Sequence, residues 1–173
     1  MRFVTAMALL GLAACGSDDT TPTPDAPDQT ATCLIPGTYG DLGTKTGSTN
    51  PGGPSTATIV LDMGPPRDSF FLKLVAGKGV FAGGLANGTF TIAGPDATFN
   101  DCGLCVNIIA DIVSGSGPTK FYYADSGSVT LTATQPPAGS ASNLHFVEVS
   151  LSTGQPVPGG CQATIGALTF SAS

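Results

Sequence analysis

The sequence predicts an all-β domain, an antiparallel β-sandwich of about eight to ten short strands, behind a disordered N-terminal tether. From residue 33 onward, apolar and polar residues alternate with a period of two, which is typical of strands that bury one face. Glycine, proline, asparagine and aspartate gather between these rows, where turns are expected. No stretch of ten residues shows a helical apolar stripe while lacking Gly and Pro. A closed barrel is the alternative arrangement for such strands.

Residues 1–14 have the form of a secretory signal peptide. Arg2 gives a short positive start, and residues 3–14 carry no charge. This run is too short for a transmembrane helix, which needs about 20 apolar residues. It ends in Leu12-Ala13-Ala14-Cys15, which resembles the lipobox of bacterial lipoproteins. The resemblance implies cleavage before Cys15, attachment of lipid to its sulfur, and a place in the cell envelope.

Residues 15–32 are predicted to form the lipidated flexible tether, and residues 33–173 the folded domain. The tether is rich in Pro, Thr and Asp and has no apolar periodicity, so it cannot bury a core. An extended chain of this length reaches about 50 Å at roughly 3.1 Å per residue. Gly16 stands where Asp would retain a lipoprotein in the inner membrane. The resemblance therefore favours the outer membrane.

The predicted strands follow one another along the folded domain. Apolar rows lie at residues 57–63, 70–75, 90–92, 104–112, 121–123, 129–133, 147–151 and 163–170. The dipeptide Asn87-Gly88 predicts a hairpin turn, because both residues tolerate positive φ. Asp125-Ser126-Gly127 predicts another turn. Within the rows, we expect Ile108 and Leu131 to point into the core and Thr130 to point away from it.

The charge of the chain limits its partners. Without residues 1–14, five basic residues stand against twelve acidic ones, which gives a formal charge of −7. An acidic surface repels phosphate backbones and anionic lipid, so nucleic acid and a membrane-binding face are disfavoured. We expect contact with the membrane through the lipid anchor only. An envelope protein or a glycan remains as a class of partner.

Four cysteines of the folded domain, Cys33, Cys102, Cys105 and Cys161, are candidates for two disulfides in an oxidising compartment. In an extended strand Cys102 and Cys105 point to opposite faces. We therefore predict two long-range bridges, one from Cys33 and one from Cys161, each to a member of the C-x-x-C. The competing arrangement joins Cys102 to Cys105 and Cys33 to Cys161 through a tight turn at Gly103. A four-cysteine zinc site would show two close pairs, which this sequence lacks.

Residues for catalysis or metal binding are few, and we assign no catalytic residue and no required cofactor. His145 is the sole histidine, and no serine has the spacing of a nucleophile elbow. Calcium is the better ligand hypothesis, because Asp96, Asn100 and Asp101 share one loop and Asp125 lies in another. Their spacing does not match an EF-hand, and such residues commonly form turns.

These observations favour a non-enzymatic envelope lipoprotein whose β-domain serves binding, adhesion or a structural role. The first alternative is a secreted hydrolase or sugar-active domain that uses loop aspartates. The second is a thiol–disulfide lipoprotein that uses Cys102 and Cys105. A hydrolase predicts acids that converge in a pocket, and a binding module predicts an exposed aromatic face or a crown of loops. A redox protein predicts an accessible bridge between the two cysteines.

Overall fold

The computed structural model describes residues 33, 37–51, 53, 56–64, 68–110, 112 and 117–172. The chain divides into two units, Met1–Thr30 and Ala31–Ser173, and every described residue belongs to the second unit. The predicted signal peptide, the predicted lipidation site Cys15 and the predicted tether lie outside the described residues. Among the helices of the described part, none has the length and apolar character needed to cross a membrane.

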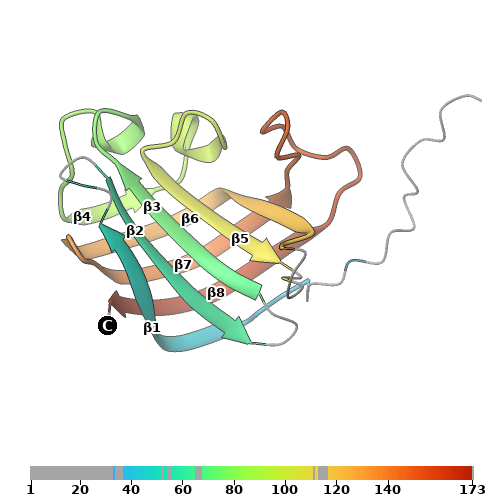
Figure 1. The fold of residues 1–173 in the computed structure, drawn as a ribbon, viewed down its shortest axis with the longest axis horizontal. Helices are drawn as coiled ribbons and strands as arrows, with labels where there is room; N and C mark the ends of the chain where they lie inside the picture. The colour runs from blue at the N-terminus through green and yellow to red at the C-terminus, as the bar shows by residue number, and fades with distance from the viewer. Residues whose placement is uncertain are drawn as a thin grey trace, which may run out of the picture. The chain divides into compact units, whose positions relative to one another are not determined.

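Eight strands build the described domain (Figure 1). They are β1 Asp41–Pro51, β2 Thr56–Gly64, β3 Asp68–Val75, β4 Gly88–Thr91, β5 Leu104–Ala110, β6 Lys120–Thr134, β7 Pro137–Glu148 and β8 Gln162–Ala172. Two short 3-10 segments, η1 Gly79–Phe81 and η2 Gly94–Ala97, lie in the connections. The all-β prediction is confirmed.

Seven of these strands close into a mixed barrel in the order β6-β5-β3-β2-β1-β8-β7, with β7 returning to β6. Neighbouring strands are antiparallel except β1 and β8, which are parallel. The first part of β6 pairs with β5, whereas residues 128–131 of β6 pair with β4. The sandwich prediction is wrong, and the closed barrel that stood as its alternative is the fold.

The long strands β6 and β7 explain the closure. They span 15 and 12 residues, and their ladder contains three register shifts. Bulges of this kind bend a strand and increase its twist. A strongly coiled sheet can bring its two edges together, and closure then removes the exposed edges that a sandwich would leave.

Four details of the predicted strands are also wrong. The row at 147–151 shares only its first two residues with β7, which runs from Pro137 to Glu148, and Leu151 is 53% exposed in a turn. The predicted rows omitted β1, which is rich in Gly and Thr and is held between β2 and β8. The rows at 121–123 and 129–133 belong to one strand, β6, because Asp125-Ser126-Gly127 is bulged strand and not a turn. Asn87-Gly88 does not close a hairpin, since Gly88 begins β4 and β4 pairs with β6.

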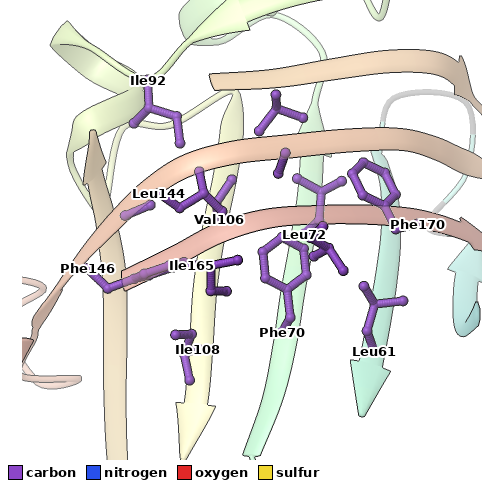
Figure 2. Packing of buried hydrophobic residues seen from close by; sticks show 14 of the residues in the cluster. Leu61, Phe70, Leu72, Ile92, Val106, Ile108, Leu144, Phe146, Ile165 and Phe170 are labelled. Atoms are coloured by element: carbon purple, nitrogen blue, oxygen red, sulfur yellow. The ribbon is translucent and has the colours of Figure 1, made fainter. Parts of the chain in front are cut away.

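The core fills the inside of the barrel with apolar side chains from facing strands (Figure 2). Phe70, Leu72 and Ile108 are 0% exposed. Leu131 is 2% exposed, which confirms that it and Ile108 point inward as predicted. Thr130 lies on the opposite face, where its hydroxyl is 2.9 Å from that of Thr89 on β4.

Candidate functional site

An irregular stretch of the β6–β7 ladder places two polar side chains together on the outer face of the barrel. The register steps from the pair Ala124–Phe146 to the pair Ser126–His145, so Asp125 is an extra residue on β6. Ala124 and Phe146 are fully buried inside. Because a bulge re-aims the side chains around it, Asp125 and His145 both lie outside, on neighbouring strands.

A second irregularity follows in the same ladder, before the pair Ser128–Ser142. Asn143 has a φ of 51°, a left-handed conformation that asparagine tolerates better than most residues. Gly127 has a φ of 124°, and a Cβ there would lie 2.7 Å from Cδ2 of Leu144 and 2.9 Å from the carbonyl oxygen of Asn143. Glycine is therefore needed at this position. Non-glycine residues in the left-handed region, such as Asn143, cluster at functional sites.

His145 is held between two oxygen atoms. Its Nδ1 lies 2.7 Å from Oδ1 of Asp125, and its Nε2 lies 3.4 Å from Oε1 of Gln162 on β8. The hydroxyl of Ser126 donates to the same Asp125 oxygen at 3.3 Å. The side chains of His145 and Asp125 are 34% and 39% exposed. The imidazole is thus fixed in orientation yet open to solvent.

A hollow of about 350 Å³ adjoins this imidazole. Its polar lining consists of hydroxyl, amide and imidazole groups from Thr38, Asn143, His145 and Thr164. Glycines also line it, and a Cβ on one of them, Gly40, would meet no other atom within 4 Å. The hollow therefore combines neutral hydrogen-bonding groups with apolar surface from Leu144 and Ile165, and a Cβ on the lining residue Gly166 would meet a carboxylate oxygen of Asp41.

The carboxylate of Asp96 has a structural role. Its Oδ1 accepts the backbone N–H groups of Gly103 and Leu104, both at 2.7 Å, and its Oδ2 accepts that of Val80 at 2.8 Å. Asp96 is 1% exposed, and a Cβ on Gly79 would overlap its carboxylate. Three backbone donors, from η1, from the turn at Gly103 and from the start of β5, are satisfied by this one side chain.

Asp96 also anchors a small apolar cluster on the outside of the barrel. The hydroxyl of Tyr123 donates to the Asp96 carbonyl oxygen at 2.6 Å, and burial together with the Asp96 charge raises the pKa of Tyr123 well above its usual range. Phe99 packs edge-on against Tyr123, with ring centroids 5.9 Å apart. Cys102 and Cys105 complete the cluster and are only 5% and 7% exposed. This burial removes the accessibility that a redox role for these cysteines requires.

The predicted disulfide pairing is wrong. The structure joins Cys102 to Cys105 and Cys33 to Cys161. The prediction treated Cys102 as part of an extended strand, but β5 begins only after Gly103. The chain turns at Gly103, whose N–H is bound by Asp96, and the two sulfurs then meet.

Three strand ends meet around the Cys33–Cys161 bridge. Nζ of Lys120, at the start of β6, lies 3.1 Å from Oε2 of Glu148, at the end of β7. The same Nζ lies 3.6 Å from Sγ of Cys161. Oε2 of Glu148 also accepts the N–H of Cys161 at 2.9 Å. Cys161 is 5% exposed, whereas Cys33 is exposed.

The calcium candidates occupy different environments. Asp96 is committed to backbone donors, and the side-chain amide of Asn100 donates to the carbonyl oxygen of Thr153 at 3.2 Å. Asp101 is exposed, and Asp125 lies beside His145. Within the described residues, no group of three His, Cys, Asp or Glu side chains is arranged to hold a metal ion.

A second hollow, of about 380 Å³, lies between the β1–β2 and β6–β7 connections. Thr58, Pro136 and Pro137 contribute to its lining. The side-chain amide of Gln135 crosses between the two connections and donates to the carbonyl oxygen of Gly53 at 3.1 Å. The residues that line this second hollow include no ionisable pair comparable to Asp125 and His145 beside the first hollow.

Comparisons with protein families, with curated proteins and with solved structures gave no match for this chain. The geometry therefore carries the functional argument. Sequence reasoning singled out His145, but it missed Gln162 and the pair Lys120–Glu148. The turn-like Asp125-Ser126-Gly127 between two apolar rows was the available signal for the bulge, since Gly inside a strand pattern indicates one.

Proposed function

We propose that this chain is a lipid-anchored envelope lipoprotein whose barrel binds an uncharged, hydroxyl-rich ligand, a glycan, in the hollow beside His145. The observation that carries the proposal is the pair of facing bulges, which fixes Asp125 against His145 beside a hollow lined by both polar and apolar residues. A fixed imidazole loses little conformational entropy when a ligand binds, and this preorganisation favours affinity.

Binding is favoured over acid–base catalysis because of the contacts of the imidazole. Both ring nitrogens of His145 face side-chain oxygens, those of Asp125 and Gln162. A general base needs one nitrogen directed at the proton that it removes. The hydrolase alternative also relied on loop aspartates, and one of these, the buried Asp96, accepts three backbone N–H groups.

The charges of the chain support a neutral ligand. The formal net charge of the whole chain is −6, and the site itself contains the carboxylate of Asp125. Anionic polymers would be repelled by both. Hydroxyl groups can both donate and accept, which matches the hydroxyls of Thr38 and Thr164 and the amide of Asn143 in the lining.

Calorimetric titration of the protein with a panel of neutral oligosaccharides tests the ligand proposal. At least one should bind, and Asn143→Gly should weaken it about two- to tenfold, because one hydrogen bond contributes roughly 0.5–1.5 kcal/mol. This variant keeps the left-handed backbone, since glycine adopts positive φ freely. Thr58→Val, in the second hollow, is the matched control and should leave affinity unchanged. Binding that Thr58→Val weakens and Asn143→Gly does not would place the ligand elsewhere.

The anchor proposal depends on Leu12-Ala13-Ala14-Cys15 and is tested separately. Mass spectrometry of the protein from native membranes should find an acylated N-terminal Cys15. Cys15→Ser should release the protein from the membrane or stall its processing. A mature form that begins at another residue and carries no lipid would contradict the anchor while leaving the ligand proposal intact.

A further inference from the structure

The two disulfides differ in their exposure to an attacking thiol. Both cysteines of the Cys102–Cys105 bridge are buried in one cluster with Phe99 and Tyr123. The Cys33–Cys161 bridge has one exposed member, Cys33, and one buried member. Among the cysteines of the two bridges, Cys33 is therefore the residue that is most open to a thiolate from solution.

The buried half of this bridge has a cation beside it. Nζ of Lys120 lies 3.6 Å from Sγ of Cys161. The Lys120 and Glu148 side chains are 17% and 15% exposed, so their charges are only partly screened by solvent. A neighbouring ammonium group stabilises a cysteine thiolate, and a disulfide exchanges faster when its leaving thiolate is stabilised.

We infer that the Cys33–Cys161 disulfide is a thiol-exchange site, at which a low-molecular-weight thiolate attacks Cys33 and Lys120 stabilises the Cys161 thiolate that leaves. The attacking sulfur forms a bond to Sγ of Cys33, and the Cys33–Cys161 bond breaks with its electron pair on Cys161. No net oxidation occurs, because one disulfide replaces another. The product carries the small thiol on Cys33 and an ion pair between Lys120 and Cys161.

Glu148 moderates this chemistry. Its Oε2 contacts Nζ of Lys120 at 3.1 Å and the N–H of Cys161 at 2.9 Å, so it positions the ammonium group against the sulfur. Its negative charge also opposes a second negative charge on Cys161. An ammonium group has three donors and can serve the carboxylate and the thiolate together. Lys120 and Glu148 therefore affect exchange with opposite signs.

The experiment incubates the oxidised protein with reduced glutathione, quenches by alkylation and maps the peptides by mass spectrometry over time. Glutathione should appear on Cys33 and the alkyl group on Cys161, while the Cys102–Cys105 bridge stays intact. A first adduct on Cys161, or equal loss of both bridges, would overturn the assignment of the attacked sulfur.

Three variants test the part played by charge. Lys120→Met should slow formation of the adduct about five- to tenfold, and Glu148→Gln should accelerate it about threefold. Lys78→Met is the matched control, since Lys78 is exposed and its Nζ donates a hydrogen bond to the carbonyl oxygen of Asn100; it should leave the rate unchanged. A purely structural Lys120 would give the opposite result, because its loss would loosen the start of β6 and accelerate exchange. An accelerated or unchanged rate in Lys120→Met refutes the inference.

Discussion

Two replacements of Asp96, by alanine and by asparagine, should lower the free energy of unfolding of the barrel by different amounts. Asp96→Ala leaves the N–H groups of Val80, Gly103 and Leu104 without their acceptor. Each buried donor without a partner costs about 1–3 kcal/mol, and removal of the buried carboxylate offsets part of the sum by ending its desolvation cost. We expect a net loss of about 4 kcal/mol in the free energy of unfolding.

Asp96→Asn should lose less of the free energy of unfolding, because the three hydrogen bonds are divided between the two carboxylate oxygens of Asp96. Oδ1 serves Gly103 and Leu104, whereas Oδ2 serves Val80. A carboxamide can keep its oxygen toward the first two donors, but its NH₂ group then faces the N–H of Val80. One bond is lost and two become neutral, so we expect a loss of about 2 kcal/mol.

Urea unfolding of the oxidised protein measures both losses. The free energy of unfolding should fall with urea concentration at the same slope in the variants as in the unchanged protein, so that a shift of the midpoint reports stability alone. Domains of this size are stable by about 5–15 kcal/mol, so the amide variant should remain folded in water. Asp101→Asn is the control, since Asp101 is an exposed neighbour and should change stability by less than about 0.5 kcal/mol. Equal losses for Asp96→Ala and Asp96→Asn, or losses no larger than the control, would refute the proposed division of donors.

Three further predictions concern the core, the ionisable tyrosine and one close approach. Leu131→Asp should lose more than about 3 kcal/mol of stability in urea unfolding, because it buries an unpaired charge. Thr130→Asp, on the outer face, should lose less than about 1 kcal/mol. Equal losses for the two variants would mean that the faces are misassigned. Since the folded-state pKa of Tyr123 lies above its unfolded value, its contribution to stability is complete below pH about 10 and falls as pH rises further. The urea midpoint should therefore drop above pH about 10, with a shallower drop in Tyr123→Phe. Gly103→Ala should lower the thermal midpoint, because its Cβ would overlap the carbonyl oxygen of Lys78, and overpacking costs about 1–3 kcal/mol; an unchanged midpoint would contradict that close approach.

The alternation of apolar residues predicted which faces are buried, but it could not predict where a strand ends. Ile108 and Leu131 are inside as expected, because period two fixes the face of each residue within a strand. Asp125-Ser126-Gly127 has the composition of a turn, yet the chain continues through it in β6. Turns and bulges both require small or polar residues with unusual φ, so composition alone does not separate them.

The disulfide prediction failed because it assumed that Cys102 and Cys105 lie in one extended strand, where residues three apart point to opposite faces. Cys102 precedes β5, and the N–H groups of Gly103 and Leu104 both turn toward the Asp96 carboxylate. The sequence places Asp96 only a few residues upstream, but nothing in its surroundings distinguishes a buried acceptor from a turn-forming aspartate.

Closure of the barrel explains why the exchange site had no sequence signal. Lys120, Glu148 and Cys161 lie at the start of β6, at the end of β7 and just before β8. The pairing of β6 with β7 and of β7 with β8 brings these strand ends to one place. Cys33 then joins them through its bridge to Cys161. A period-two pattern is the same for a sandwich and for a barrel, because it reports burial and not which edges pair. The groups at this site are therefore set by strand order, and their separation along the chain follows no motif.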